Sequence, residues 1–423
     1  YPNSLLRNNR DGTFTDVTEE AGLLSFHPTG TAAWGDFDND GWVDLFVGNE
    51  SQGKENHPCE LYRNNGDGTF REIARELGLA DLGFVKGVIW GDYNNDGRLD
   101  LYISRLGAPN RLFRNEGKQG LKHGENSSKI SWAFTDVTSQ AGVAAPVNSF
   151  ATWFWDYDND GWQDLFVAAF HTDKLGDIAA TYLGLPNQAE RSRLYRNNHD
   201  GTFADVTRPA GLDKVLLIMG ANFGDLDNDG FLDAYFGTGE PDFRALLPNR
   251  MFRNAKGSYF QDVTTSGGFG HLQKGHAISF GDINNDGDQD IYADMGGAFP
   301  GDAFWNALFA NPGHGGSWVT LELEGARSNR AAIGTRVKIS VESEQGPRAI
   351  YQSVNSGGSF GASSLRLETG LGDAKAIREV EIFWPASRTT DKITNLQLNR
   401  FYRIREGERT AIPLVRKSFR LES

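Results

Sequence analysis

The chain has 423 residues, a formal net charge of −14, 51 glycines and 14 prolines. This length suffices for a large core and favours two domains, or one repeat domain plus a smaller one. A single cysteine, Cys59, excludes an intrachain disulfide, and the longest apolar runs are strand-length, so no membrane span is predicted. The acidic balance argues against nucleic acid as a partner.

The charge is unevenly distributed along the chain. From Ser317 onward there are 17 Lys and Arg against 12 Asp and Glu, an excess of +5, which leaves −19 for the residues before it. This change predicts a domain boundary near Pro312. We expect a repeat domain at 1–312, a second β domain at 317–410 and a C-terminal tail at 411–423. The chain starts at Tyr1 without a visible signal peptide, so the compartment has to be inferred from chemistry.

The first predicted element is a β-hairpin at residues 5–14. The motif Leu-Tyr-Arg-Asn followed by Asp-Gly-Thr-Phe stands at 61–70 and 194–203. The copy at 5–14 has Leu6 in place of Tyr, and looser copies lie at 112–115 and 251–254. Asn-Gly and Asp-Gly pairs between apolar runs are strong hairpin signals. A tail of the type Phe-x-Asp-Val-Thr follows several of these copies.

Five acidic loops alternate with these hairpins. They start 56, 64, 69 and 57 residues apart, which is typical of a repeat architecture. Each loop has carboxylates or amides at positions 1, 3 and 5, Gly at position 6 and Asp at position 9. Position 7 can offer its backbone carbonyl. This set of oxygens predicts a cage for a hard cation, of which Ca²⁺ fits best, although the last acid of an EF-hand loop stands at position 12.

We therefore predict about five Ca²⁺ ions, one in each loop. The predicted ligands, loop by loop, are Asp36, Asp38, Asp40, Trp42, Asp44; Asp92, Asn94, Asp96, Arg98, Asp100; Asp156, Asp158, Asp160, Trp162, Asp164; Asp225, Asp227, Asp229, Phe231, Asp233; and Asp282, Asn284, Asp286, Asp288, Asp290. Five such ions would add ten positive charges and leave −4. We interpret them as structural, because five equivalent and self-sufficient sites fasten hairpins; the alternative is a sensor or a bridge to a ligand.

Each repeat period predicts a four-stranded unit. In the first, strands at 31–34 and 45–47 flank the acidic loop, and strands at 61–63 and 70–73 flank the second turn. The strands after the loops are apolar on both faces, as strands between neighbouring sheets are. Such units, repeated radially, form a β-propeller. We expect an all-β fold with six or seven four-stranded blades. Either C-terminal strands complete the broken first unit, which we favour, or one blade is missing.

These motifs carry a family resemblance. The loops and the Leu-Tyr-Arg-Asn frame resemble the FG-GAP/VCBS repeats of integrin-like propellers. The residues at 318–321, 328–337, 356–360, 370–372 and 380–385 resemble the ASPIC/UnbV domain of cartilage acidic protein-like proteins. One departure is Trp155, which stands where the other repeats have Gly before the loop. Integrin-type propellers imply protein or glycan partners and adhesion.

The opposite ends of the same strands predict a rim that is a possible ligand-binding mouth. Its residues are His27, Glu50, Lys86, Arg105, His171, Glu240, Lys274, His276 and Asp294, with Phe150 beside them. A rim of this kind is a candidate site by its concave, polar character, and the alternative is a solvated surface. Inserts at 171–193, where a short helix is predicted, 240–249 and 295–306 break the repeat period. Four arginines of the second domain, Arg327, Arg330, Arg336 and Arg348, are explained by docking on the acidic propeller or by an acidic glycan.

Three functions stay open from the sequence. The first is a secreted or periplasmic binding or adhesion module with structural Ca²⁺, because extracellular modules bind Ca²⁺ at roughly 10⁻⁴–10⁻³ M. The second is an enzyme, such as a lyase, isomerase or biosynthetic cyclase, that uses the channel mouth. The third is a structural surface or filament subunit. No nucleophile elbow, zinc pair or phosphate loop stands out, so no catalytic residue is predicted.

Overall fold

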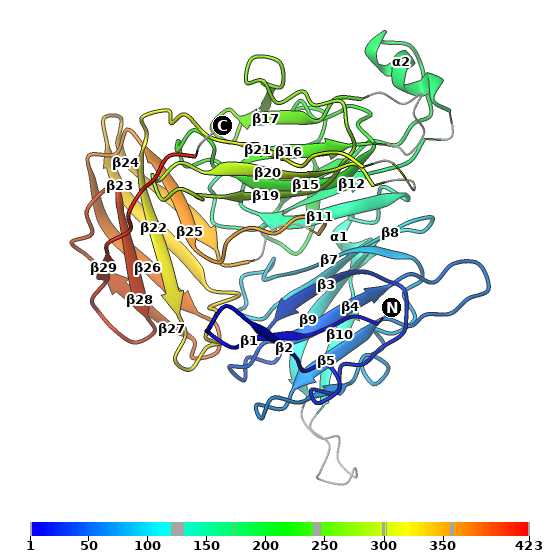
Figure 1. The fold of residues 1–423 in the computed structure, drawn as a ribbon, viewed down its shortest axis with the longest axis horizontal. Coiled ribbons are helices and arrows are strands. Elements are labelled where there is room, and N and C mark those ends of the chain that lie inside the picture. The colour runs from blue at the N-terminus through cyan, green and yellow to red at the C-terminus, as the bar shows by residue number, and fades with distance from the viewer. Residues whose placement is uncertain are drawn as a thin grey trace.

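The computed structural model of the chain describes residues 2–119, 131–172, 174–239, 247–297, 301, 303–355 and 359–421. Its regular structure is β-sheet apart from two short helices, α1 (Thr138–Ala141) and α2 (Gly176–Tyr182). Helix α2 lies in the 171–193 insert, as predicted. Figure 1 shows a large repeat domain beside a C-terminal β domain. The predicted all-β fold is confirmed. Within the described ranges, no helix is long and apolar enough to cross a membrane.

The repeat domain consists of antiparallel sheets, each built from consecutive strands around one acidic loop. Within the described residues these are unit 1, β3 (Thr29–Gly35), β4 (Asp44–Asn49), β5 (Glu60–Asn64), β6 (Phe70–Glu72); unit 2, β7 (Val85–Gly91), β8 (Asp100–Arg105), β9 (Arg111–Gln119), β10 (Ser131–Asp136); unit 3, β11 (Ser149–Trp155), β12 (Asp164–Ala169), β13 (Arg193–Asn197), β14 (Phe203–Asp205); unit 4, β15 (Ile218–Gly224), β16 (Asp233–Thr238), β17 (Arg250–Asn254), β18 (Phe260–Asp262); and unit 5, β19 (Gly275–Gly281), β20 (Asp290–Met295), β21 (Ala307–Phe309).

Each acidic loop connects the first two strands of its unit. In unit 1 the pairing of β3 with β4 runs up to Gly35 and Asp44, so the loop spans the residues between them. The first strand of every unit carries a register shift, a β-bulge, at its far end. Second strands β8, β12 and β16 are buried along their whole length, as expected for strands between neighbouring units. In β20, by contrast, Tyr292 and Asp294 are exposed.

The two ends of the repeat domain are incomplete among the described residues. The N-terminal sheet has only β1 (Leu6–Asn8) and β2 (Phe14–Asp16), and unit 5 has only three strands. The other four sheets of the repeat domain are four-stranded, as the sequence predicts. The expected completion of the first unit by C-terminal strands is wrong, because β29 (Ile412–Leu414) pairs with β28 (Arg400–Arg405) inside the second domain. That strand continues an existing sheet, which satisfies its backbone locally.

The C-terminal domain has two four-stranded sheets. Their strand orders are β25-β22-β28-β29 and β24-β23-β26-β27, and the β22–β28 pair is parallel. The remaining bounds are β22 (Ser317–Glu324), β23 (Arg336–Ser343), β24 (Gly346–Ser353), β25 (Leu367–Gly372), β26 (Ala376–Trp384) and β27 (Thr389–Ile393). Side chains such as Leu321, Ile339 and Trp384 are fully buried between the sheets. The same hydrophobic cluster extends to Phe46 and Trp90 of units 1 and 2, so the domains share a continuous core.

Candidate metal centres and domain interface

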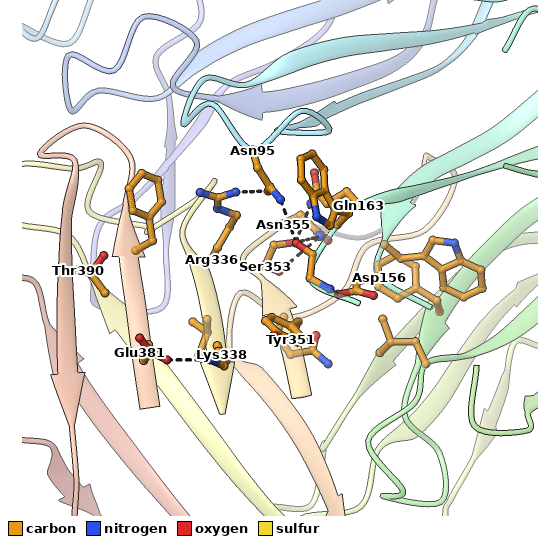
Figure 2. A pocket seen from close by; sticks show the side chains of 18 residues that line it. Asn95, Asp156, Gln163, Arg336, Lys338, Tyr351, Ser353, Asn355, Glu381 and Thr390 are labelled. Carbon is orange, nitrogen blue, oxygen red and sulfur yellow. Dashed lines mark hydrogen bonds and ion pairs between the residues drawn. The ribbon is translucent and has the colours of Figure 1, made fainter. Parts of the chain in front are cut away.

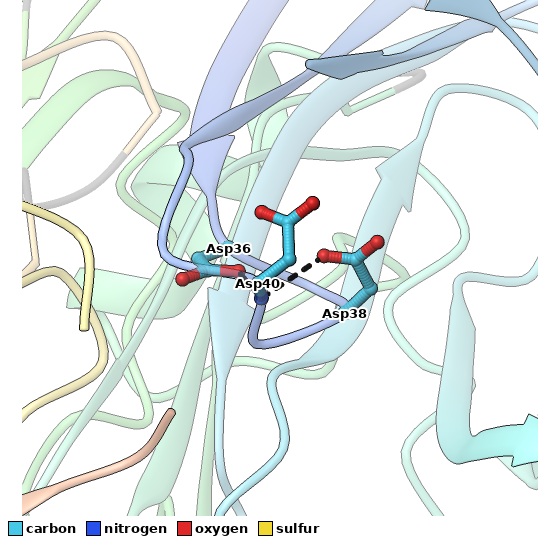
Figure 3. A group of neighbouring side chains, drawn as sticks. All are labelled: Asp36, Asp38 and Asp40. Carbon is cyan, nitrogen blue, oxygen red and sulfur yellow. Dashed lines mark hydrogen bonds between the residues drawn. The ribbon is translucent and has the colours of Figure 1, made fainter. Parts of the chain in front are cut away.

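The first acidic loop wraps around the carboxylate of Asp36. Oδ1 of Asp36 accepts a hydrogen bond from the N–H of Asp40 (3.0 Å), and Oδ2 accepts one from the N–H of Gly41 (3.1 Å). Asn39 and Gly41 have φ angles of 55° and 94°, a left-handed conformation that Asn and Gly tolerate best. Figure 3 shows the carboxylates of Asp36, Asp38 and Asp40 around this turn. The motif therefore folds locally around its first acid.

The last acid of the loop joins it to the third strand of the unit. Oδ2 of Asp44 accepts the N–H of Phe37 (3.1 Å), and Oδ1 accepts the N–H of Asn64 (2.9 Å). In all five loops the position-1 Asp accepts the N–H groups of positions 5 and 6. In all five the position-9 Asp accepts the N–H of the third-strand Asn. The loops are thus equivalent in geometry.

Acid oxygens converge in three of the five loops. In each of these loops, oxygens from three carboxylates lie within 4.8 Å of one another. The groups are Asp36, Asp38 and Asp40; Asp156, Asp158 and Asp164; and Asp225, Asp227 and Asp229. Oxygens around one Ca²⁺ lie at about 2.3–2.6 Å from the ion, hence up to about 5 Å apart. These three groups can hold metal ions.

Loops 2 and 5 differ because an amide replaces the acid at position 3. The amide nitrogens of Asn94 and Asn284 donate to Asp96 (3.0 Å) and Asp286 (2.7 Å). At position 7, the N–H groups of all five residues donate to the position-5 carboxylate. Metal ligation by loops 2 and 5, and by the position-7 carbonyls, stays a prediction.

Several buried carboxylate oxygens fit a cation directly. Asp100 Oδ2, Asp158 Oδ1 and Asp227 Oδ1 are buried and have no hydrogen-bond partner among the described residues. A buried carboxylate oxygen without a partner is costly, unless a cation or donor compensates it. Each of these oxygens belongs to a different acidic loop, at position 3 or 9. Because the donors are all hard oxygens, they suit Ca²⁺ better than a thiophilic metal.

Basic side chains already balance the outer acids. The Arg63 guanidinium contacts Asp38 and Asp40 at 2.6 Å each, and Arg253 bridges Asp227 and Asp229 in the same way. Both arginines come from the Leu-Tyr-Arg-Asn type motif on the third strand. They hold the outer carboxylates in place while leaving inner oxygens available. The arginine of this motif is therefore part of the loop's electrostatics.

Buried acids of the first and third loops have raised pKa values. Burial, followed by the neighbouring carboxylates, raises the pKa of Asp36 to about 7 and that of Asp44 to about 9. Burial also raises the pKa of Asp158 to about 6. A divalent cation would reverse this effect, because it favours the charged form of every acid around it.

The metal-free protein should therefore lose stability as the pH rises. A carboxyl whose folded pKa exceeds its unfolded value stabilises the fold below about pH 4 and loses that contribution up to its folded pKa, here about 7 to 9. With EGTA present, we expect the melting temperature to fall by on the order of 5 °C between pH 5 and pH 8. With saturating Ca²⁺ the fall should vanish. Equal pH profiles with and without Ca²⁺ would contradict this expectation.

The C-terminal domain lies on the acidic loops. The N–H of Gly370 donates to Asp225 Oδ2 in loop 4 (3.0 Å), and the N–H of Tyr351 donates to Asn159 Oδ1 in loop 3 (3.0 Å). The Arg366 guanidinium donates to the carbonyl of Asp282 in loop 5 (3.0 Å). The edge strands of the domain thus use loop oxygens as hydrogen-bond partners, so loop geometry and domain docking are linked.

Docking also explains part of the arginine set. Arg348 donates to the carbonyl of Asp229 (2.9 Å), and Arg336 lies 3.5 Å from Asp92 and stacks over Phe383. The Arg327 carbonyl lies against Gly41. Arg330 instead pairs with Glu324 of its own domain (3.7 Å) and is mostly exposed. The side chains of Arg336 and Arg348 therefore contact the repeat domain, as the docking hypothesis predicts, whereas Arg327 meets it only through its backbone.

Two family models match this chain. The model described as FG-GAP-like repeat matches residues 1–47, 36–103 and 156–236, which include the first four acidic loops. The model described as ASPIC and UnbV matches residues 325–411, which form most of the C-terminal domain. The chain therefore carries FG-GAP-like repeats and a C-terminal ASPIC and UnbV domain. The resemblance expected from the motifs is confirmed.

Curated relatives share a common name. Cartilage acidic protein 1 of Xenopus tropicalis is 29% identical over 251 residues, covering 57% of this chain and 33% of that protein. Cartilage acidic protein 1 of Homo sapiens is 27% identical over 245 residues, covering 57% and 32%. The chain thus spans about a third of the length of the curated relatives it matches. A solved structure, BBS1N in complex with ARL6DN soaked with mercury, aligns at a TM-score of 0.33 and 11% identity over 86% of this chain and 92% of that chain.

The Asn at position 4 links each FG-GAP loop to the next, a role that the sequence did not predict. The position-4 Asn of loops 1 to 4 donates its side-chain N–H to the Gly carbonyl of the next loop, at 2.7–3.1 Å. The donors are Asn39, Asn95, Asn159 and Asn228, and the acceptors are Gly97, Gly161, Gly230 and Gly287. The signal was the presence of Asn at position 4 in all five copies. Each loop therefore helps to position the next.

A cavity of about 340 Å³ lies between loop 3 and the ASPIC and UnbV domain, as Figure 2 shows. Trp155, Phe223 and Leu232 line it on the FG-GAP side, and Arg336, Lys338, Tyr351 and Glu381 on the other. Trp155 stands where the other units have a glycine. In unit 1, that glycine lets unit 2 pack closely, because a Cβ at Gly35 would lie 2.7 Å from the Trp90 ring. Here the Trp155 ring stands 5.6 Å from Phe223 instead. The substituted position thus lines the gap between units 3 and 4.

A segment of the ASPIC and UnbV domain lies against the first strands of FG-GAP units. Ser359 N–H donates to the Thr152 carbonyl of β11 (3.4 Å), and the Phe360 carbonyl accepts from Ile278 of β19 (3.3 Å). The Phe360 ring lies 4.6 Å from that of Phe150. This segment crosses the first strands of units 3 and 5. The C-terminal domain therefore contacts the first strands of two units that are not adjacent in sequence.

Rim residues have mixed surroundings. Glu50 and Lys86 pair at 2.6 Å between units 1 and 2, and Lys86 lies over the Phe84 and Phe150 rings. Nδ1 of His27 lies 3.2 Å from that of His57. Arg105 is buried and donates to the Pro109 carbonyl (2.6 Å). Of the others, Lys274 is buried, His171 and His276 are half-buried, Asp294 is exposed, and Glu240 lies outside the described residues. A ligand-binding role for this rim stays a prediction.

Proposed function

We propose that this chain is a calcium-stabilised extracellular binding module, with one Ca²⁺ in each acidic loop and a protein or glycan as partner. The observation that carries the calcium part is the repeated loop geometry, in which backbone N–H groups hold the position-1 and position-9 acids while inner oxygens converge. Orphaned buried carboxylate oxygens support it. The family match to FG-GAP-like repeats agrees with it.

The proposed ions have a structural role. Each would neutralise acids that repel one another and whose burial is costly. Because the ASPIC and UnbV domain bonds to loops 3, 4 and 5, ions there would also fix its docking surface. The ions would therefore fasten both the units and the two domains.

The extracellular location rests on affinity. Loops of this kind in extracellular modules bind Ca²⁺ at roughly 10⁻⁴–10⁻³ M, which requires a calcium-rich exterior. The name of the curated relatives refers to cartilage, which is consistent with an exterior location. For a small polar ligand or glycan unit, the 340 Å³ cavity beside Trp155 is the candidate site, since small-ligand pockets span about 300–1,000 Å³ and combine aromatic with polar groups.

Removing one loop acid should remove one ion. For Asp227→Ala, we expect calorimetric titration with CaCl₂ to give one Ca²⁺ fewer than the parent chain, because Asp227 supplies an inner oxygen without another partner. The melting temperature should drop by about 3 °C, since repeat stability is roughly local. Glu76→Ala, which removes an exposed acid outside the loops, serves as the control. Unchanged stoichiometry, or complete unfolding, would refute the loop assignment.

A further inference from the structure

Unit 5 has an open position where units 1 to 4 have a fourth strand. Among the described residues its sheet ends at β21, and the chain enters the C-terminal domain at Ser317. A groove of about 1000 Å³ lies there. We call it the fourth-strand slot; it is lined by Leu226, Arg253, Gly267, Phe269, Leu308 and Phe309.

The other units show how such a slot is filled. In units 2 to 4, the Phe of the fourth strand packs on the position-2 residue of the preceding loop: Phe134 on Phe37 (6.0 Å), Phe203 on Tyr93 (5.7 Å) and Phe260 on Tyr157 (5.9 Å). In the slot, the corresponding position-2 residue is Leu226, which is only half-buried. The hydrophobic seat for an aromatic side chain is therefore present.

Backbone groups also have counterparts in the slot. The fourth-strand Phe donates its N–H to the turn of the preceding unit, as in Phe70 to Ala21 (2.9 Å) and Phe260 to Ala210 (2.8 Å). Gly267 corresponds to Ala21 and Ala210, because its N–H also bonds to the Val four residues earlier. Its carbonyl is the matching acceptor at the groove.

The edge of β21 offers backbone groups that match the Val and Thr of the fourth-strand motif. In unit 4, Val263 donates its N–H to the Met251 carbonyl (2.9 Å), and the Met251 N–H donates to the Thr264 hydroxyl (3.0 Å). Leu308 takes the place of Met251, as its pairing with Tyr292 shows. The acid in between serves its own segment, since Asp262 accepts the Thr264 N–H (3.1 Å). The Phe, Asp, Val and Thr of the pattern Phe-x-Asp-Val-Thr thus each have a defined role.

Third-strand geometry at the slot is intact. Asn311 bonds to Asp290 through its N–H (2.8 Å) and to the Leu226 carbonyl through its amide (2.8 Å), as its equivalents do in other units. Arg253 lines the slot. Its equivalent in unit 1, Arg63, stacks on Trp132 of unit 2, with its guanidinium carbon 4.9 Å from the ring centroid. The slot therefore continues an interface already formed between units 1 and 2.

We propose that this slot binds an extended segment of another polypeptide, with the pattern aromatic-x-Asp-apolar-Thr, as the fourth strand of unit 5. Strand addition satisfies the free edge of β21, and the side-chain seats give specificity. The proposal names a protein partner for the binding module proposed above.

The test uses the full chain and a labelled peptide with the sequence of residues 201–207, followed by fluorescence anisotropy. We expect saturable binding, and loss of binding when the peptide's Phe is replaced by Ala. Leu226→Ser should weaken binding about tenfold, because it removes the seat for the aromatic ring. Leu183→Ser, which changes an exposed leucine on α2, is the matched control and should bind as the parent does. Leu308→Pro should abolish binding, because it removes the N–H that corresponds to the Met251 donor to the Thr hydroxyl and distorts the strand edge.

Three results would overturn the proposal. They are no binding of the peptide, binding unaffected by Leu226→Ser and Leu308→Pro, and a concentration-dependent dimer that the peptide dissociates, which would make a second copy the occupant. Unchanged melting curves verify that each variant folds. If Leu308→Pro does not fold, Leu226→Ser alone tests the slot. Parallel titrations in Ca²⁺ and in EGTA separate a failure of calcium binding from a failure of peptide binding.

Discussion

EGTA should lower the melting temperature of this protein by about 10 °C relative to 2 mM CaCl₂. At that concentration a site with a dissociation constant of about 10⁻⁴ M contributes roughly 1.8 kcal/mol, and five sites add several times this amount. The metal-free loops must instead hold buried acids close together, which raises the pKa of Asp36 and Asp44. Differential scanning calorimetry measures the shift.

Two controls define the calcium effect. Excess CaCl₂ added after EGTA should restore the original melt, whereas MgCl₂ at the same concentration should not, because Mg²⁺ requires a smaller and more regular site. A melting temperature within 1 °C of the calcium-loaded value after chelation would refute structural calcium. Restoration by Mg²⁺ would assign the loops to a less selective cation.

Asp225→Asn should destabilise the protein by about 3 kcal/mol and loosen the C-terminal domain. Asp225 is buried, and its Oδ2 accepts N–H groups from Gly230 of its own loop and from Gly370 of the C-terminal domain. An amide NH₂ in this place cannot accept both bonds. Hydrogen exchange of the Gly370 amide should therefore accelerate at least tenfold.

Asp36→Asn is the matched control for this variant. Asp36 holds the same loop position and accepts the equivalent bonds from Asp40 and Gly41, and the C-terminal domain meets its loop through the Arg327 carbonyl instead. Its substitution should weaken calcium binding without changing exchange at Gly370. Equal exchange in both variants would mean that Asp225 does not hold the two domains together.

Much of the loop could be predicted from the sequence, because its determinants are local. Asp at positions 1 and 9, Gly41 at a positive φ and the alternating hairpins all act within a few residues, and the structure forms them as expected. The recurrence of Asn at position 4 indicated that Asn39 has a structural role. Its hydrogen-bond acceptor could not be predicted, because Gly97 lies 58 residues away in the sequence. No local pattern specifies a partner so distant.

Strand pairing at the two ends of the repeat domain could not be predicted from the sequence. Among the described residues the edge of β21 stays unpaired, because the chain leads from Phe309 into the C-terminal domain, and β29 joins β28 in that domain. Both outcomes depend on which neighbouring strand offers unpaired backbone groups. Sequence periodicity carries no information on that choice.

The repeat, its all-β units, the oxygen-rich loops and the family resemblance follow from the amino-acid sequence, because they depend on residue type and short spacing. The three-dimensional fold adds that the C-terminal domain contacts the acidic loops, that Phe360 lies beside Phe150, and that unit 5 keeps an open strand position among the described residues. Those features arise from contacts between residues far apart in the chain, where shape and unpaired hydrogen-bond groups select the partner.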